Sequence, residues 1–460
     1  MELKHAKKTI QLHEKRERLR GMREIASREM FDVIIIGAGF AGLIAARELE
    51  MLGRRVLIIE ARDRLGGRTW VDRRLGCDVE LGGTYVHWYQ PHVWNELSRY
   101  HLTVDEAPPA KKVFWITDGK LKSDTIEGFS AILQDSYEQI IKEAVSNVPN
   151  PFDVLRSEAV KKMDHLSITD FLLKFPLTQE QLDLISCSIS IDFNGPLEKG
   201  AATQMFRWWA FSQGVRSAFI DTVGRYKIKQ GTKALVNAIA EDVKAEIIFS
   251  SIVSLVKKEN THIVVQSEDG SKYDGKSVIV TVPLSTLEKI QFIPGLSENK
   301  QAFIKQKQVS EGVKVWARIK GELEPFMTYA PPGYPLQSIH FEKTVEGDTI
   351  VVGFGEDASV LSPDDRAAVE KAIQVWFPQA TVMESTGHDW VHDEFSMETW
   401  PMLMPNQLTS YIEDMRLPEH GVFLAGTTYA NGWAGFIDGA IESGMVTGRK
   451  VHQYLKKGTI

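Results

Sequence analysis

The segment from residue 31 to residue 69 constrains the fold more than any other part of the chain. It reads FDVIIIGAGFAGLIAARELEMLGRRVLIIEARDRLGGRT. The apolar run at 33–36 predicts a buried parallel strand. Gly37, Gly39 and Gly42 follow in the G-x-G-x-x-G spacing, which forms a tight turn, allows a pyrophosphate to approach and lets the next helix pack on the strand. The start of that helix presents free backbone N–H groups to the phosphates.

A second strand and an acidic residue complete the dinucleotide-binding pattern. The helical pattern ends at Gly53, and the apolar run at 56–59 leads into Glu60. The pattern places here a carboxylate that binds a ribose 2′-hydroxyl, and its negative charge disfavours a 2′-phosphate and therefore NADP. The segment thus predicts dinucleotide binding. The alternative is an ordinary β-α-β unit that uses glycine only for packing.

A second glycine turn follows the acid and distinguishes between dinucleotides. Arg62, Arg64 and the run LGGRT at 65–69 add fixed positive charge directly after Glu60. Nicotinamide-dependent dehydrogenases do not need such a turn. The order G-x-G-x-x-G, E-A-R and L-G-G-R resembles the FAD-dependent amine oxidase family. The resemblance implies FAD as the cofactor and gives Arg68 a role in neutralising its pyrophosphate.

Further motifs carry this resemblance. In the family, the backbone at Gly82 and Gly83 passes close to the isoalloxazine ring, and Val253 matches the position whose backbone meets the adenine. The continuation WYQPHVW at 88–94 resembles the branch of bacterial nicotine and pseudooxynicotine oxidases. L-Amino-acid oxidases place a carboxylate-binding arginine just after the equivalent glycines, where this chain has TYV at 84–86. The resemblance therefore disfavours an α-amino acid substrate.

The C-terminal region resembles the part of the family that closes the flavin site. The run VFLAGT at 422–427 predicts a strand that ends at a glycine turn, and NGWAGFIDGA at 431–440 leads into a helix. In the family, the N-terminus of this helix can stabilise negative charge on reduced flavin. The resemblance places Trp433 near the ring, and Trp400 and Phe436 at or next to the two aromatic positions that flank the amine. No cysteine lies near Trp400, so we expect noncovalent FAD.

A lysine inside an apolar strand is the remaining candidate for chemistry. The sequence SEGVKVWARI at 310–319 alternates and predicts a strand of the substrate domain. Val313 and Val315 flank Lys314, which makes its position look interior. The resemblance implies that Lys314 holds a water against flavin N5, since a buried ammonium group needs a partner. The alternative is an edge lysine that extends to solvent.

From the motifs and the resemblance we predict three groups of site residues. The catalytic group is Lys314, Trp400 and Phe436. The cofactor-binding group is Gly37, Gly39, Phe40, Ala41, Gly42, Glu60, Ala61, Arg62, Gly66, Gly67, Arg68, Gly82, Gly83, Thr84, Val253, Gly426, Thr427, Trp433, Gly435, Phe436, Ile437 and Ala440. The substrate-pocket group is Tyr85, His87, Trp88 and Asn431. No metal is expected, because His388 and His392 stand four positions apart without an evident third ligand.

The predicted elements indicate an α/β protein. The resemblance implies an FAD-binding Rossmann-like domain of the glutathione-reductase type with an inserted α+β substrate domain of mixed sheet and helices. We assign to the FAD-binding domain residues 31–108, 230–312 and 396–460. We assign to the substrate-binding domain residues 109–229 and 313–395. The charged segment 1–30 predicts a helix that packs along the body of the protein or across a homodimer.

Composition narrows the class of protein. The chain has 460 residues, 43% of them hydrophobic, and a net charge of −7, which allows two domains and gives no sign of nucleic-acid binding. Cys77 and Cys187 are the only cysteines, so we expect a reducing, cytoplasmic location. No run approaches the roughly 20 apolar residues of a membrane span. The charged start lacks the apolar core of an export signal.

The combined expectation is FAD-dependent oxidation of a C–N bond by hydride transfer to flavin N5. The product would be an imine or iminium that hydrolyses or cyclises, with the flavin reoxidised by O2, forming H2O2, or by an electron-carrier protein. The branch resemblance implies a secondary or tertiary, alkaloid-like amine such as a nicotine-type compound. The alternatives are a primary amine or polyamine oxidase, an NAD-dependent dehydrogenase and a non-catalytic flavoprotein scaffold.

Overall fold

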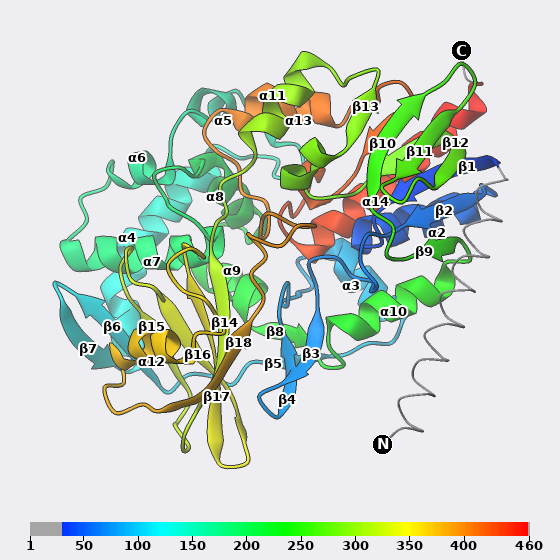
Figure 1. Ribbon diagram of the computed structural model, residues 1–460. Coiled ribbons are helices and arrows are strands. Elements are labelled where there is room, and N and C mark those ends of the chain that lie inside the picture. Colours follow the sequence, from blue (N-terminus) through cyan, green and yellow to red (C-terminus); the bar gives the residue numbers. More distant parts are fainter. Residues whose placement is uncertain (1–29, 459–460) are drawn as a thin grey trace, which may run out of the picture.

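Two large sheets and a group of helices make up the protein (Figure 1). The computed structural model describes residues 30–458, so the predicted charged helix at 1–30 lies outside the described residues except for Met30. The first sheet has the order β13-β10-β11-β12-β1-β2-β9, and β19 also pairs with β12. Its strands are β1 (Met30–Ile36), β2 (Val56–Ile59), β9 (Glu246–Ile248), β10 (Val253–Lys258), β11 (Ile263–Ser267), β12 (Lys272–Val280), β13 (Gln291–Ile293) and β19 (Val422–Leu424).

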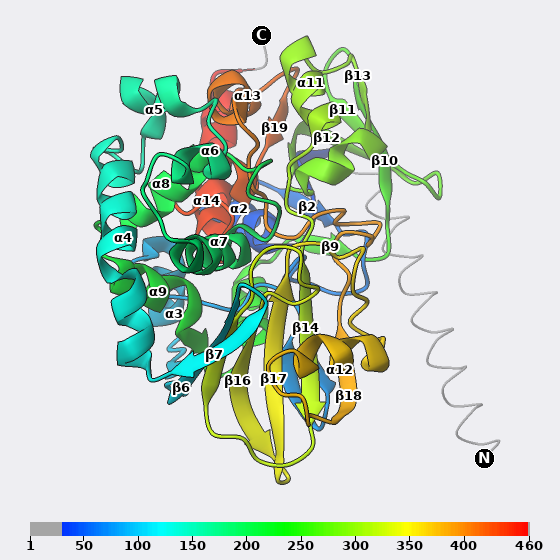
Figure 2. The same ribbon diagram turned by 90° about the vertical axis from the view of Figure 1, so that its left-hand side faces the viewer.

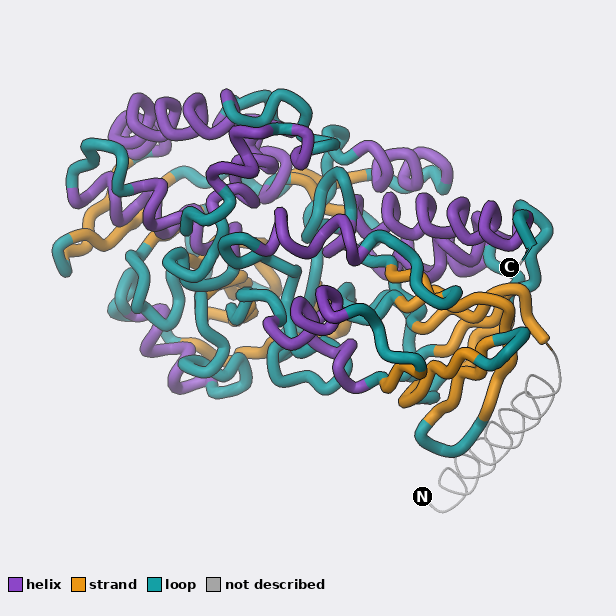
Figure 3. Tube along the Cα trace, turned by 90° about the horizontal axis from the view of Figure 1, so that it is seen from above, coloured by secondary structure: helices purple, strands orange, loops and turns teal. Residues whose placement is uncertain are grey.

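The central strand β1 is buried on both faces, as its unbroken apolar run predicts. It pairs in parallel with β2 and with β12. Ile34 and Ile36 pack into one apolar cluster, whereas Val33 and Ile35 pack into another. The second cluster includes residues of α2 (Phe40–Met51), α10 (Thr232–Asp242) and α14 (Ile437–Lys456). Seen from above, helices lie along one side of these strands near the C-terminus (Figure 3).

The second sheet has the order β18-β14-β17-β16-β15-β6-β7. Its strands are β6 (Lys112–Thr117), β7 (Lys120–Asp124), β14 (Val313–Ile319), β15 (Phe326–Tyr329), β16 (Ser338–Val345), β17 (Asp348–Gly355) and β18 (Val382–Gly387). Val313 and Val315 pack with α12 (Arg366–Gln374) on one face of this sheet. Lys314, which alternates with them, points to the other face.

Helices gather beside the second sheet (Figure 2). They are α4 (Ile126–Ser146), α5 (Glu158–Met163), α6 (Ile168–Leu172), α7 (Gln179–Phe193), α8 (Ala202–Phe211) and α9 (Arg216–Gly224). Hydroxyl side chains start several of them, because an Oγ can accept from a free N–H group of the first turn. Ser167 with Asp170 and Thr178 with Gln181 form capping boxes at α6 and α7.

Smaller elements connect these layers. They are β3 (Val71–Arg74), β4 (Cys77–Glu80), α3 (Pro91–Arg99), β5 (Val104–Glu106), β8 (Tyr226–Ile228), α11 (Glu298–Gln306), α13 (Gln407–Met415) and the 3-10 turns η1 (Val154–Arg156), η2 (Leu284–Lys289) and η3 (Thr427–Tyr429). The first sheet draws its strands from the segments assigned to FAD binding, and the second sheet from the segments assigned to substrate binding. This separation of the two sheets supports the predicted boundaries between the FAD-binding and substrate-binding domains, which stay a proposal.

Helices α2 and α14 approach each other closely through glycine. A Cβ added at Gly444 would lie 2.3 Å from the carbonyl oxygen of Ala41. One added at Gly448 would lie 3.1 Å from the carbonyl oxygen of Ala45, which is much less crowded. The contact therefore needs glycine at residue 444 in particular, and it joins segments that are far apart in the sequence.

Gly444→Ala should destabilise the protein because its methyl group overlaps the α2 backbone. We expect the free energy of unfolding to fall by about 2 kcal/mol, a typical cost of overpacking. Gly448→Ala is the matched control, since the gain in helix propensity of about 1 kcal/mol offsets its milder crowding. Thermal unfolding of the two variants is the measurement. Equal midpoints would contradict the packing argument.

Candidate cofactor and substrate cavity

A cavity of about 470 Å³ opens where strands of the first sheet end. Its lining includes Ile36 at the end of β1, Ile59 at the end of β2, Thr281 after β12 and Gly426 after β19. Ligands of open α/β sheets bind at this carboxyl edge, because loops there surround a crevice. Lys314 and Phe354 of the second sheet also line the cavity, so it is bounded by both sheets.

The first glycine turn has the backbone shape that the sequence predicts. Gly37 has φ +107°, a value that L side chains rarely adopt. A Cβ at Gly42 would lie 2.0 Å from the carbonyl oxygen of Gly37, so Gly42 supports the turn by close packing and does not line the cavity. A Cβ at Gly39 would have Gly67 Cα, at 3.9 Å, as its nearest neighbour. No side chain caps α2, which leaves its first N–H groups for an anion.

Glu60 lies beside this turn at the end of β2. Its Oε2 accepts from the backbone N–H of Ala38 at 2.6 Å, and its Oε1 accepts from the N–H of Arg62 at 2.8 Å. The carboxyl is 6% exposed. Burial raises its pKa, and the two backbone hydrogen bonds oppose that shift. The carboxyl therefore sits on the cavity wall in a fixed orientation, where a ribose hydroxyl could donate to it.

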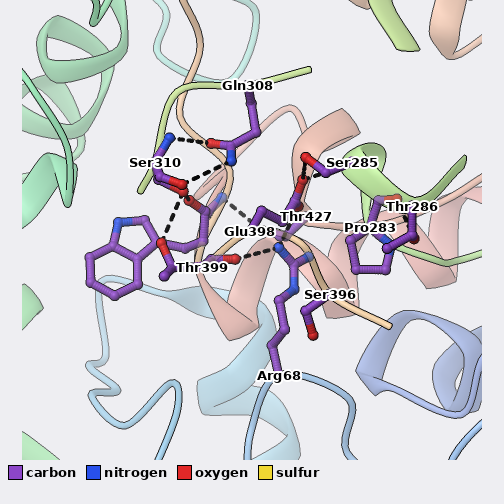
Figure 4. A network of polar contacts seen from close by, with 12 residues as sticks. Arg68, Pro283, Ser285, Thr286, Gln308, Ser310, Ser396, Glu398, Thr399 and Thr427 are labelled. Carbon is purple, nitrogen blue, oxygen red and sulfur yellow. Dashed lines mark hydrogen bonds and ion pairs between the residues drawn. The ribbon is translucent and has the colours of Figure 1, made fainter. Parts of the chain in front are cut away.

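Arg68 lines the cavity but is already paired with an acid. Its Nη1 donates to Oε1 of Glu398 at 2.6 Å and to the carbonyl oxygen of Thr399 at 2.6 Å (Figure 4). The other Glu398 oxygen accepts from the N–H and the hydroxyl of Ser285. Glu398 thus balances the charge of Arg68 within the protein, and the expected role of Arg68 in neutralising a pyrophosphate stays a prediction. Sequence reasoning missed Glu398.

A chain of hydrogen bonds positions the backbone of Trp400. The hydroxyl of Ser310 donates to the carbonyl oxygen of Trp400 at 2.6 Å, and the hydroxyl of Thr399 donates to Ser310 at 2.9 Å (Figure 4). The indole Nε1 of Trp400 donates to the carbonyl oxygen of Asp192 at 3.0 Å. Hydrogen bonds thus hold Trp400 at its backbone and at its indole ring, and Trp400 lines the cavity.

Lys314 extends from β14 to the second glycine pair. Its Nζ donates to the carbonyl oxygen of Gly82 at 3.0 Å and to Oγ1 of Thr84 at 2.8 Å. Burial lowers its pKa to about 7, while the nearby carboxylate of Glu80 opposes that shift. Two oxygen contacts leave one donor position of an ammonium group for a water or ligand. The alternative of an edge lysine in bulk solvent does not hold.

Glu80 is a further residue that the sequence did not reveal. Its carboxylate accepts from the N–H and the hydroxyl of Thr232, each at 2.7 Å, and so binds the start of α10. Its backbone oxygen accepts from the indole of Trp316 on β14 at 3.0 Å. Glu80 therefore joins β4, α10 and β14 close enough to Lys314 for its charge to oppose the lowering of the lysine pKa. Acidic residues with no motif around them carry little signal in one sequence.

Aromatic rings form another part of the cavity wall, which we call the aromatic wall: Trp208, Trp400 and Phe436. Phe436 precedes α14, and Trp208 of α8 meets it edge to face at 4.8 Å between centroids. Trp400 and Phe436 both line the cavity, and Trp208 joins them. Trp433 is fully buried behind this wall, where it stacks on Phe211 and donates to the carbonyl oxygen of Tyr89. It does not line the cavity, contrary to the expectation.

Most predicted cofactor residues meet at this one cavity. The lining includes Gly37, Gly39, Phe40, Ala41, Glu60, Ala61, Arg62, Gly66, Gly67, Arg68, Gly82, Gly83, Thr84, Val253, Gly426, Thr427, Gly435, Phe436, Ile437 and Ala440. These residues come from distant parts of the chain. Together they provide the glycine cradle, free helix N-termini and carboxyl group that suit a dinucleotide. The chain therefore fits the FAD that the motifs imply.

Three of the four predicted substrate-pocket residues lie elsewhere. Tyr85 lines the cavity. His87 is buried behind the wall, where its Nδ1 accepts from Tyr89 and burial lowers its pKa to about 4. Trp88 is 44% exposed, and Asn431 is exposed as well. The motif marked the right segments, but the side-chain directions depend on packing that a motif does not encode.

The two histidines weighed as metal ligands pair with acids instead. Nε2 of His388 lies 2.8 Å from Oδ2 of Asp393, and Nδ1 of His392 lies 2.7 Å from Oδ2 of Asp389. Across residues 30–458, no three His, Cys, Asp or Glu side chains converge as a metal site would require. Nor does this part of the chain contain a helix that is long and apolar enough to cross a membrane.

Comparisons with known proteins agree with this geometry. A family model described as flavin containing amine oxidoreductase matches residues 40–451. The chain is 38% identical to a pseudooxynicotine dehydrogenase of Pseudomonas sp, over 93% of this chain and 87% of that relative. It is 34% identical to a nicotine dehydrogenase of Pseudomonas putida, over 92% of this chain and 89% of that relative.

Solved structures share the fold. A putrescine oxidase bound to putrescine aligns with a TM-score of 0.80 at 21% identity, covering 92% of this chain and 99% of that one. The cyclohexylamine oxidase of Brevibacterium oxydans aligns with a TM-score of 0.78 at 17% identity, covering 93% and 100%. The predicted α/β fold class is confirmed.

Glu398→Gln should destabilise the protein because it leaves the Arg68 guanidinium without a counter-charge. Breaking a buried pair costs about 3–5 kcal/mol, but the Arg68 side chain is 23% exposed. Solvent screening lowers the expected loss to about 2 kcal/mol. Glu413→Gln, at an exposed position of α13, is the control and should change the free energy of unfolding by less than about 0.5 kcal/mol. Chemical denaturation of the FAD-loaded protein measures both.

Proposed function

The chain belongs to the flavin-containing amine oxidoreductase family and is therefore an FAD-dependent enzyme that oxidises amines; we propose that its substrate is a secondary or tertiary, alkaloid-like amine. The relatives named for pseudooxynicotine and nicotine support this substrate class. The observation that carries the proposal is that Lys314 and the aromatic side chains of Trp208, Trp400 and Phe436 line one cavity.

The proposed cofactor position follows from the cavity lining. The N-terminus of α2, with Gly39 and Gly67 beside it, would hold the pyrophosphate, and Glu60 would accept from the ribose. The backbone near Val253 would meet the adenine. Cys77 and Cys187 are buried and neither lines the cavity, which supports noncovalent binding. When bound, FAD accepts a hydride from a C–H next to the amine nitrogen.

The chain's own residues would prepare the amine. The walls of Trp400 and Phe436 exclude water and favour the neutral form of the amine, whose lone pair assists C–H cleavage. Lys314 would hold a water through its free donor position, with Gly82 and Thr84 fixing its direction. Water admitted after oxidation would hydrolyse an iminium product, unless the product cyclises first.

The alternatives fare differently. Membership of a flavin-containing family argues against an NAD-dependent dehydrogenase. A primary amine or polyamine oxidase stays an alternative. A polyamine, however, needs carboxylates along the cavity to bind its ammonium groups. The carboxyl of Asp192 lines the cavity, but the positive charge of Arg216 acts on it. We leave O2 and an electron-carrier protein as the two candidate acceptors. The cytoplasmic location and the homodimer likewise stay proposals.

An anaerobic amine panel tests the substrate class. We expect nicotine-type secondary and tertiary amines to bleach the flavin absorption of the FAD-loaded enzyme at least tenfold faster than primary amines or diamines of similar size. Stopped-flow absorbance is the measurement. A protein that binds FAD yet is bleached by no amine would be the scaffold alternative. Faster bleaching by diamines would support the polyamine alternative.

Lys314 should give the reaction a pH dependence near neutrality. Its pKa is lowered to about 7, so the side chain is protonated below that pH and neutral above it. The flavin-reduction rate is measured against pH with two amines of different basicity. An inflection that stays near pH 7 with both amines belongs to a group of the protein, because the pKa of the amine differs between the two. We expect Lys314→Met to remove this inflection and Lys320→Met, at an exposed position after β14, to keep it. An inflection that only follows the amine would remove Lys314 from this role.

A further inference from the structure

Polar side chains without protein partners gather in one part of the cavity. Helices α4, α7 and α9 and strand β15 each contribute one, and we call the group the polar tetrad: Tyr137, Asp192, Arg216 and Tyr329. Within residues 30–458, none of these side chains makes a hydrogen bond or a close ion pair. The Arg216 guanidinium lies over the Tyr137 ring, 5.0 Å from its centroid.

Burial makes the missing partners significant. Tyr137 is 3% exposed and Tyr329 is 9% exposed, yet both line the cavity. Nε of Arg216 is buried without a partner. Leaving a buried polar atom such as this Nε unpaired is costly, and the other polar groups of the tetrad face the cavity. A ligand group that enters this part of the cavity would complete the hydrogen bonds.

The second sheet fixes how far the polar tetrad lies from Lys314. Lys314 pairs with Phe354, and Phe354 pairs with Ser338. The pairing of Met327 with His340 places Tyr329 opposite Ser338 in the same row. Three strand-to-strand steps of about 4.8 Å separate the ends of this row by about 14 Å. A substrate could therefore reach from the lysine to the polar tetrad along the floor of the cavity.

The polar tetrad joins the aromatic wall on its other side. The backbone oxygen of Asp192 accepts from the indole of Trp400. Burial raises the pKa of the Asp192 carboxyl to about 8, with Arg216 opposing the shift. At neutral pH this carboxyl is thus largely protonated and can donate, as can the guanidinium and the two phenols. The tetrad presents donors and one positive charge.

We propose that the polar tetrad is a subsite for a hydrogen-bond-accepting group of the amine substrate, such as a carbonyl oxygen, at the end away from the oxidised C–N bond. The inference rests on the proposed amine oxidation and adds a second functional group to its substrate. Arg216 would supply a charge-assisted hydrogen bond, and the phenols would fix the direction of the acceptor.

The same charges disfavour a second ammonium group in this place. An ammonium would face the Arg216 guanidinium, and like charges repel each other. Asp192 alone would have to lose its proton to compensate. The subsite therefore distinguishes an amine that carries a neutral acceptor from a diamine of the same length.

A matched pair of amines tests the subsite. The pair consists of two aryl-alkyl N-methylamines that differ only in a ketone or a methylene group next to the aryl ring, and the equally long diamine is the third ligand. Anaerobic flavin reduction of the FAD-loaded enzyme at several concentrations gives a limiting rate and an apparent Kd. We expect the ketone to bind at least about tenfold more tightly than the methylene analogue, as a hydrogen bond to a charged donor predicts.

Variants then assign this preference to the polar tetrad. Tyr329→Phe and Arg216→Gln should each reduce the ketone preference about fivefold or more, because each removes a hydrogen-bond donor from the subsite. Tyr334→Phe, at a partly buried position outside the cavity lining, should keep the preference. FAD content and the thermal midpoint establish that each variant is folded.

The outcomes separate the subsite from the proposed function. An undiminished ketone preference in both variants, or tighter binding of the diamine, would overturn the subsite. If no amine reduces the flavin, the proposed function fails, and isothermal titration calorimetry of the same ligands still measures the Kd ratio. A ratio near one in the unmodified enzyme would then also overturn the subsite.

Discussion

The backbone contact between α2 and α14 is the constraint on which the cavity depends. Gly444 lets α14 approach the carbonyl oxygen of Ala41 in the first turn of α2. The starts of both helices line the same cavity, and neither has a side-chain cap. The N–H groups and the positive dipole ends of two helices are therefore available to an anionic cofactor. A wider spacing would separate the glycine turn from the aromatic wall.

The effective charge of each basic side chain in the cavity depends on whether an acid is paired with it. Arg68 is balanced by Glu398, and Arg62 is balanced by Asp393. Lys314 instead contacts neutral oxygens, and burial lowers its pKa towards neutrality. The basic groups that line the cavity thus have different roles. Two of them order the loops, and one keeps a proton that can leave near neutral pH.

Sequence predicts the glycine-rich side of the cavity well because backbone shape decides it. The turn from Gly37 to Gly42, the acid at Glu60 and the strand containing Lys314 lie where local pattern places them. His87 and Trp433 show the limit. Each belongs to a correctly recognised segment, yet packing turns its side chain away from the cavity.

Other residues in and around the cavity were less predictable for a different reason. Glu398, Asp192 and Arg216 lie in segments whose motifs, if any, do not mark them as site residues, and their importance arises from partners distant in sequence. Helical periodicity indicates which faces are buried but does not distinguish a core position from a cavity wall. Register across the second sheet, which places Tyr329 in line with Lys314, is likewise absent from local pattern.

The contact between Ala41 and Gly444 also has a consequence for the order of assembly. Protein synthesis produces the glycine turn early and α14 late, with the whole second sheet made between them. The first β-α-β unit can gain local structure at once, but the cavity closes only when α14 docks. Until then the nascent chain exposes the apolar flank of α2, which is the surface that a chaperone would have to shield.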